Sequence, residues 1–368
     1  MISMLSIFLG LIASASTLII CVNAETIGHR LRIMDRPDNR RKRHAKDTPL
    51  VGGVGILLPL LVWVGGALMT GLVADDGTLA ALMLCAIGVG LIGFADDQSS
   101  ISPMSRILFL LVFLALAFFI DRSLISSTLN WGSFDPTPIP AWVYCLLLAI
   151  TTAGIVNAVN MADGQNGLVP SMFVIWSLCL MLVGDPVVSQ LALVLACLSF
   201  IVLLFNLRGA LFLGDCGSYG VTFLLGLLTM LSHAQARVSI ETATVWFFIP
   251  VVDCLRLIVT RSLQGRSPMA PDTDHFHHRL QAKLGDTYGL VAYICSVAGC
   301  SIISAIAPQF ALVCLIVLAS IYFSFAWLAD STATLAGSQP DDELFDLDKD
   351  FANVVPLVVE KNQSRESA

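Results

Sequence analysis

Acidic side chains stand in short polar stretches that separate long apolar runs of this sequence. Asp96 and Asp97 are adjacent at the end of one run, and Asp215 follows a glycine near the start of another. Two neighbouring carboxylates at the negative end of a helix repel each other, unless a cation or a proton-transfer role offsets their charge. These stretches therefore indicate a cation site or proton transfer, although Asp215 by itself is also typical of a helix cap.

Two asparagines precede a third acidic stretch at helical spacing. Asn157, Asn160 and Asp163 lie three residues apart, which places them near one face of a helix end. Three oxygen-bearing groups on one face are typical of a site for a hard cation or a nucleotide. The alternative is an ordinary helix end, in which Asp163 forms a turn and Gly164 is the cap.

A lysine and a threonine introduce a glycine-rich segment. Lys46 and Thr48 precede residues 50–55, which contain three glycines. Backbone N–H groups at a helix start, together with a lysine, suit a phosphate group. The basic residues at 40–43 are also what the positive-inside rule or the binding of anionic lipid would require. The segment is therefore a candidate phosphate site.

Histidines cluster in one later stretch. Half of the six histidines fall within four residues, as His275, His277 and His278, and Arg279 follows them directly. Imidazole and guanidinium groups together suit the recognition of a diphosphate. A structural zinc site explains the cluster less well, because no cysteine accompanies the histidines.

The elements that must position these stretches are long apolar runs. Of the 368 residues, 56% are hydrophobic and 13% are charged, whereas a typical soluble domain has about 25% charged residues. Runs of about 20 apolar residues span a bilayer as helices, and a barrel would instead show alternating strands of about 10 residues. The predicted fold is an all-α, polytopic membrane protein. Its eleven helices are expected at residues 1–22, 50–73, 78–95, 106–120, 140–158, 168–184, 187–205, 217–233, 242–260, 287–306 and 310–328.

Basic residues predict the orientation of these helices. With the 24–49 loop inside, 18 of the 20 lysines and arginines fall on the cytoplasmic side, and Arg122 and Arg237 fall outside. This split predicts a periplasmic N-terminus, a cytoplasmic C-terminus and a cytoplasmic position for every polar stretch described above. We expect a transmembrane catalytic domain at residues 1–329. Residues 330–368, with nine acids and three bases, are expected to form a mobile cytoplasmic tail.

Carboxylates, asparagines, a lysine and imidazoles at one membrane boundary suit a particular chemistry. In phosphoryl-transfer sites Mg²⁺ is held by one or two carboxylates together with substrate phosphates. At the boundary, one substrate can arrive from water and the other from the membrane. The residues therefore predict metal-assisted phosphoryl transfer to or from a lipid.

The five polar stretches described above lie between about residues 40 and 280. In their order and spacing along the chain they resemble the polyprenyl-phosphate N-acetylhexosamine-1-phosphate transferases, or glycosyltransferase family 4. The resemblance implies eleven transmembrane helices in a bacterial cytoplasmic (inner) membrane, a cytoplasmic active site, and Mg²⁺ as cofactor, which Mn²⁺ can replace. It implies transfer of a sugar-1-phosphate from a UDP-sugar to undecaprenyl phosphate, releasing UMP. Membrane lipids are expected partners, nucleic acid is not, and a homodimer is left open.

Smaller features resemble one branch of that family. The segments at 35–37, 50–53 and 205–208 look like the WecA-type branch, which uses UDP-N-acetylglucosamine. Phe276 interrupts the three consecutive histidines expected of the peptidoglycan branch. The implied role is the first membrane step of cell-surface polysaccharide synthesis, of the O-antigen or common-antigen type found in lipopolysaccharide. The sequence departs from the branch at Thr273, where an arginine is usual.

The resemblance also implies roles for individual residues. The expected metal ligands are Asp215 and Asn160. Asp96 or Asp97 is expected to deprotonate or position the lipid phosphate, and Asp163 is expected to help hold the metal or the nucleotide. Substrate contacts are expected from Lys46, Thr48, Asn157, Arg208, His275, His277, His278 and Arg279.

Two alternatives to this activity remain at the level of sequence. Within the class, the substrate could be another UDP-N-acetylhexosamine, and the reaction could proceed by direct attack or through a covalent aspartyl-phosphate. In a different class, Asp253 and Arg256, three apart inside an apolar run, could serve a lipid or ion transporter rather than pair with each other. Polar groups gathered on one face argue against a transporter, whose site lies near the membrane midplane.

Overall fold

The computed structural model describes residues 4–36, 46–72, 77–132, 134–267 and 274–335, with side chains up to residue 325. The chain divides into two compact units, Met1–Tyr322 and Phe323–Ala368. The basic residues 40–43, Thr273 and residues 336–368 of the expected tail lie outside the described residues. All contacts discussed below belong to the first unit.

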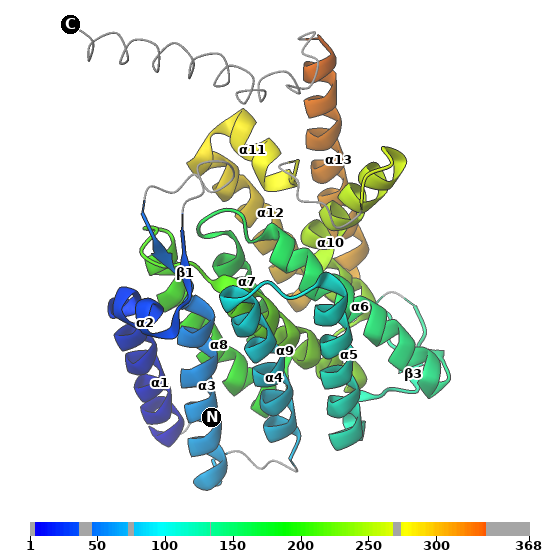
Figure 1. Cartoon of the computed structure of the whole chain (residues 1–368). Coiled ribbons are helices and arrows are strands. Elements are labelled where there is room, and N and C mark those ends of the chain that lie inside the picture. The colour runs from blue at the N-terminus through cyan, green and yellow to red at the C-terminus, as the bar shows by residue number, and fades with distance from the viewer. Residues whose placement is uncertain (1–3, 37–45, 73–76, 133, 268–273, 336–368) are drawn as a thin grey trace, which may run out of the picture. The chain divides into compact units, whose positions relative to one another are not determined.

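The described residues form thirteen α-helices, two short 3-10 turns and four two-residue strands (Figure 1). The elements are α1 Met4–Val22, α2 Ala24–Leu31, β1 Met34–Asp35, β2 Thr48–Pro49, α3 Gly52–Met69, α4 Thr78–Gln98, α5 Pro103–Ile120, η1 Arg122–Leu124, β3 Thr128–Leu129, β4 Thr137–Pro138, α6 Ala141–Ala162, α7 Leu168–Val183, α8 Pro186–Asn206, α9 Gly214–Ala234, α10 Ile240–Leu263, α11 Phe276–Leu284, α12 Asp286–Ile306, η2 Pro308–Phe310 and α13 Ala311–Leu335.

Long apolar helices dominate the fold, as the sequence predicts for a multi-pass membrane protein. Each of the eleven predicted ranges coincides with a helix, and ten helices among the described residues are long and apolar enough to cross a membrane. The other apolar helix, α7, has 16 residues and a length of about 24 Å, less than the roughly 30 Å hydrocarbon layer. The number of crossings and the orientation of the termini stay predictions.

The ends of some helices differ from the prediction. Helix α5 begins at Pro103 rather than at residue 106, because the Ser102 side chain accepts a hydrogen bond from the Ser105 amide and proline suits a first helical position. Helix α9 begins at Gly214 rather than at residue 217, which places Asp215 in its first turn. The expected loops at 24–49 and 260–286 contain regular structure that the sequence analysis missed, namely α2, the antiparallel pair β1–β2 and α11.

Helix α9 is the centre of the bundle, with 94% of its apolar window buried. It packs against α3, α4, α6 and α7, and Figure 1 shows α4 and α9 side by side. Close approach depends on glycine, since small residues let helix backbones touch. A Cβ atom at Gly53 of α3 would overlap the backbone of Gly217, and one at Gly93 of α4 would overlap the carbonyl of Asp215. Backbone contact therefore positions the first turn of α9.

Candidate functional site

A cavity of about 2230 Å³ opens at the end of the bundle where α4 and α6 finish and α9 begins. Ligand pockets are usually about 300–1,000 Å³, so this cavity has room for two substrates. Residues of β1 and of each helix from α4 to α12 line it. Nine of the thirteen residues expected at the site line it, namely Asp96, Asp97, Asn157, Asn160, Asp163, Asp215, His275, His277 and His278.

Asp97 caps a helix other than its own. Its two carboxylate oxygens accept the amide N–H groups of Asp215 (2.9 Å) and Cys216 (3.1 Å) at the start of α9. Helix α9 has no side-chain cap from its own N-cap residue, Leu213. Asp215 therefore does not cap α9, and the reading of that residue as a simple cap is wrong. The cap leaves the Asp215 side chain free to face the cavity.

Asp96 is paired with an arginine that the site prediction missed. The Asp96 carboxylate accepts Arg106 Nη1 at 2.6 Å and the Ile101 amide at 2.7 Å. The same Nη1 donates to the Tyr219 hydroxyl at 2.6 Å and lies 3.9 Å from an Asp215 oxygen. Arg106 thus links α4, α5 and α9. The only signal for it in the sequence was a basic residue at the same end of the next apolar run.

The asparagines upstream of Asp163 behave differently from each other. Asn160 donates from its amide to Asp215 Oδ1 (2.7 Å) and to the Ser218 hydroxyl (2.9 Å). Asn157 turns back onto its own helix and donates to the Ala153 carbonyl at 2.8 Å. Both line the cavity. Asn160 is therefore the residue that joins α6 to the acidic turn of α9.

Asp163 is the C-cap residue of α6 and faces the same cavity. Burial raises the pKa of this carboxyl to about 7, and the nearby Asp215 carboxylate contributes to the shift. A group with such a pKa holds or releases a proton near neutral pH. This is the property that a proton-transfer role requires.

The acidic wall has the chemistry to hold a divalent cation. Asp96, Asp97, Asp163 and Asp215 line the cavity, and Arg106 is the cation paired with them among the described residues. No group of three or more His, Cys, Asp or Glu in that part of the chain forms a ready metal cluster. Mg²⁺ commonly takes one or two carboxylates and completes its shell with water and substrate phosphates, so these hard oxygen donors fit it.

The histidines form another part of the cavity lining, here called the histidine wall, on α11 and at its N-cap. The rings of His275 and His277 stack with centroids 5.5 Å apart, and His278 lies 4.2 Å from His277. Burial, with smaller effects from His278 and His275, lowers the pKa of His277 to about 3, so this ring is neutral at physiological pH. Its buried Nε2 makes no hydrogen bond with the described residues. His277 can therefore offer a substrate a neutral hydrogen bond but not a positive charge.

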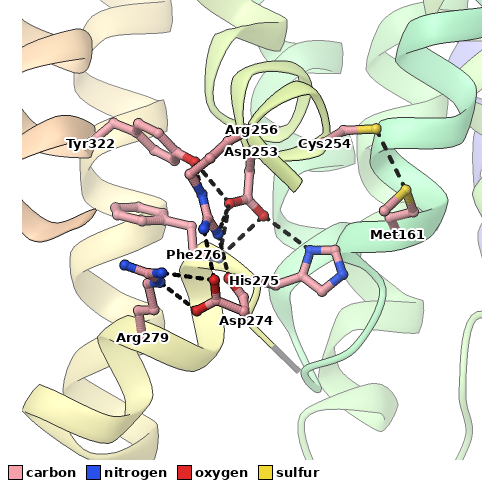
Figure 2. A network of polar contacts seen from close by, with 9 residues as sticks. All are labelled: Met161, Asp253, Cys254, Arg256, Asp274, His275, Phe276, Arg279 and Tyr322. Atoms are coloured by element: carbon pink, nitrogen blue, oxygen red, sulfur yellow. Dashed lines mark hydrogen bonds and ion pairs between the residues drawn. The ribbon is translucent and has the colours of Figure 1, made fainter. Parts of the chain in front are cut away.

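Arg279 points into an ion-pair network instead of lining the cavity (Figure 2). Its Nε and Nη2 donate to the two oxygens of Asp274 at 2.6 and 2.7 Å. Asp274 also accepts Arg256 Nη1 at 2.8 Å. The predicted ion pair between Asp253 and Arg256 is confirmed at 3.0 Å. The role expected for Arg279 at the diphosphate stays a prediction.

Three other expected substrate residues lie outside the cavity wall. Lys46 and Arg208 are exposed, and Thr48 is buried with its hydroxyl donating to the Lys46 carbonyl at 3.1 Å. The idea that the amides at the start of α3 bind a phosphate is wrong. The N–H groups of Gly52 and Gly53 donate to the carbonyls of Phe212 and Leu213, at 3.0 and 2.8 Å.

The fold and cavity define a class: multi-pass helical membrane proteins with a polar, acid-rich site at one end of the bundle. Residues 79–233, from α4 to the last turns of α9, match the sequence model of glycosyl transferase family 4. The family resemblance seen in the sequence is confirmed over these residues.

Individual relatives extend over more of the chain. It is 28% identical over 292 residues to the "probable undecaprenyl-phosphate N-acetylglucosaminyl 1-phosphate transferase" of Bacillus subtilis (strain 168), covering 76% of this chain and 78% of the relative. It is 29% identical over 269 residues to the "undecaprenyl-phosphate alpha-N-acetylglucosaminyl 1-phosphate transferase" of Escherichia coli (strain K12), covering 69% and 71%. A "decaprenyl-phosphate N-acetylglucosaminephosphotransferase" of Mycobacterium leprae (strain TN) is 28% identical over 292 residues, again covering 69% and 71%.

Proposed function

We propose that this protein transfers N-acetylglucosamine-1-phosphate from UDP-N-acetylglucosamine to undecaprenyl phosphate and releases UMP. The observation that carries the proposal is a single cavity, at the end of a bundle of apolar helices, that joins four carboxylates, Arg106 and three histidines. Such a cavity can receive a water-soluble nucleotide and a lipid headgroup at the same time. The names of the three relatives given above, each an N-acetylglucosaminyl phosphate transferase, support the choice of substrates.

The chemical step is an exchange of one diphosphate for another. An oxygen of the lipid phosphate attacks the β-phosphorus of the UDP-sugar, and a new P–O bond forms. The bond between the β-phosphorus and the bridging oxygen breaks, and UMP leaves with that oxygen. Because a diphosphate bond is both broken and made, the reaction is reversible.

The residues of the cavity can divide this work between two walls. Asp163, whose pKa lies near 7, can take up a proton from the lipid phosphate as that group becomes the nucleophile. Arg106 holds Asp96 in place by an ion pair. His275, His277 and His278, which also line the cavity, meet the diphosphate and the sugar. Positioning of the two phosphates accounts for most of the catalysis in reactions of this kind.

Asp215, supported by Asn160, would hold the Mg²⁺ ion that this chemistry uses, and Mn²⁺ can replace it. The bound ion neutralises charge that develops on the phosphate oxygens. The proposal places the active site on the cytoplasmic face of a bacterial inner membrane, where UDP-sugars are available. It places the reaction at the first membrane step of a cell-envelope polysaccharide of the O-antigen or common-antigen type.

Purified protein in lipid nanodiscs or detergent provides the test. It is incubated with undecaprenyl phosphate, Mg²⁺ and a panel of labelled UDP-sugars, and lipid-linked product is measured. We expect product from UDP-N-acetylglucosamine and none after chelation of the metal. No product from any UDP-sugar would overturn the activity, and product from another N-acetylhexosamine alone would correct the substrate. Exchange of labelled UMP into the UDP-sugar without lipid would replace direct attack by a covalent route.

A further inference from the structure

A buried carboxylate on α10, Asp253, contacts His275 (Figure 2) and is not among the residues that line the cavity. Its side chain accepts hydrogen bonds from four residues and is 6% exposed. The donors are His275 Nδ1 at 3.0 Å, the Phe276 amide at 3.1 Å, Arg256 Nη2 at 3.0 Å and the Tyr322 hydroxyl at 2.9 Å. A buried carboxylate with this many donors is held in one orientation.

The surrounding charges are balanced. Asp253 and Asp274 face Arg256 and Arg279, so two acids meet two guanidinium groups. Burial alone would raise the pKa of Asp274, but the hydrogen bonds from Arg279 and Arg256 outweigh it and lower that pKa. Among the described residues, the two acids and the two guanidinium groups of this cluster carry equal and opposite charge. Its effect on the cavity is therefore exerted through the groups that Asp253 holds.

Asp253 holds the first residues of α11. It accepts the amide of Phe276, the first residue of that helix, and the positive end of a helix favours such a carboxylate. The Phe276 ring packs against Tyr322 and Tyr293, with centroids 4.8 and 5.7 Å away. Helix α11 is thus attached to α10, α12 and α13 at the point where the histidines begin.

The bond to His275 also selects one ring nitrogen for the cavity. A carboxylate only accepts, so Nδ1 of His275 carries the hydrogen and donates it to Asp253. His275 lines the cavity, and Nε2 is then the ring atom that remains to meet a ligand. Carboxylates behind functional histidines fix the tautomer and the ring orientation in this way, and their loss typically costs about 10- to 100-fold in affinity or activity.

We propose that Asp253 is a positioning residue that docks the start of α11 and orients His275 so that Nε2 meets the nucleoside diphosphate of the substrate. This inference rests on the proposed function for the identity of that ligand. It gives a role to a residue that the sequence analysis associated only with an ion pair or a transporter. The role differs from that of a general structural ion pair, because it acts through one named imidazole.

Double-mutant cycles separate these roles. Asp253→Asn is combined with His275→Ala in one cycle and with His278→Ala in a second, because His278 bonds to Gln281 rather than to Asp253. We expect Asp253→Asn to lower kcat/KM for the UDP-sugar by about 10- to 100-fold, with the KM for the lipid phosphate unchanged. The loss should disappear in the His275→Ala background and persist in the His278→Ala background.

A matched control lies on the same helix. Glu241, near the other end of α10, is a buried carboxylate (4% exposed) that accepts the Gly132 amide at 2.8 Å. Glu241→Gln should lower the melting temperature and leave kcat/KM unchanged. If Asp253→Asn does not fold, Asp253→Glu is used, since it keeps the charge for Arg256 but moves the acceptor away from its position opposite His275. A wild-type kcat/KM in the folded variant would overturn the proposal.

The two cycles also distinguish the competing outcomes. If the loss of kcat/KM caused by Asp253→Asn is unchanged in both histidine variants, Asp253 acts independently of His275. If that loss disappears in both variants, Asp253 acts on α11 as a whole and not through His275 in particular. Both results contradict the proposal. The Kd of UDP in the presence of Mg²⁺ is also measured for every variant of the two cycles. An inactive wild-type protein would therefore refute the proposed reaction, while UDP binding would still decide the role of Asp253.

Discussion

The two walls of the cavity treat their charges in opposite ways. On the acidic wall four carboxylates line the cavity, and Arg106 is the cation paired with them among the described residues. Next to His275, two acids pair with two arginines. They are Asp253, Asp274, Arg256 and Arg279. Uncompensated charge at a cavity surface is what a cation or a developing transition state can use, whereas a balanced buried network mainly fixes geometry. The acidic wall is therefore suited to the chemical step, and the balanced network is suited to holding the histidines in place.

The largest expected effect follows from removing charge on the acidic wall. Asp215→Ala should lower turnover by about 10³-fold or more, since it deletes the proposed metal ligand and the acceptor of Asn160. Turnover is measured with UDP-N-acetylglucosamine, and membrane insertion by fractionation and gel filtration. The protein should still insert, because the apolar helices are unchanged. An active Asp215→Ala protein would show that Asp215 is not a ligand of the metal.

An intermediate effect should separate the cap role of Asp97 from a role as base. Asp97→Asn keeps an oxygen for the amides at the start of α9 and should retain most of the stability, whereas Asp97→Ala should lose about 0.5–2 kcal/mol. Measurements of melting temperature and kcat on both variants test this. If Asp97 acts as a cap, kcat should fall further in Asp97→Ala than in Asp97→Asn.

Asp185 provides the control for that comparison. It caps α8 by accepting the amides of Val187 and Val188, at 2.8 and 2.9 Å, and it does not line the cavity. Asp185→Ala should cost similar stability and leave kcat unchanged. Equal and complete loss of kcat in Asp97→Asn and Asp97→Ala, with stability intact, would instead identify Asp97 as the base.

The smallest effect concerns the balanced network. The arginines lower the pKa of Asp274 below its unfolded value, so the ion pairs stabilise the protein above about pH 4, and this contribution disappears as pH falls through the folded pKa. Asp274→Asn should be less stable than wild type at pH 7, by under about 1 kcal/mol because this carboxylate is 40% exposed. Melting temperatures of the two proteins should converge as pH falls below about 4 and through the folded pKa of Asp274. A constant difference across that range would contradict the assignment.

The sequence predicted the parts of this molecule that depend on local composition. Apolar runs located the ten long apolar helices of the described residues and the shorter α7, because each helix has a continuous hydrophobic length. Polar residues at their ends predicted nine of the residues that line the cavity, and Asn160 and Asp215 do meet. Residues whose role depends on a partner in another helix were not found. Asp97 reaches the amides of α9 across about 118 positions of sequence, and a pairing of Arg106 with Asp96 has no local signature.

In the histidine stretch, the residue types indicated a function, but the sequence did not reveal the local structure. The residue types indicated diphosphate recognition, but the nine-residue helix α11 was read as a loop because it is short and mostly polar. That helix turns Arg279 toward Asp274 and away from the cavity. Asp274 directly precedes His275 in the sequence, which gives no sign of its partners. Its pairing with two arginines depends on the position of α10, which periodicity does not reveal.

The glycine contacts at the centre of the bundle determine how its helices respond to membranes of different thickness. A bilayer that becomes thinner or thicker makes transmembrane helices tilt or slide. Helices α3 and α4 touch α9 backbone to backbone at Gly53 and Gly93, so they have no side-chain layer in which to slip. The three helices must tilt as one body, and Asp97 and Asp215 keep their separation. Changes in lipid composition should therefore alter access of the lipid substrate before they alter the catalytic geometry.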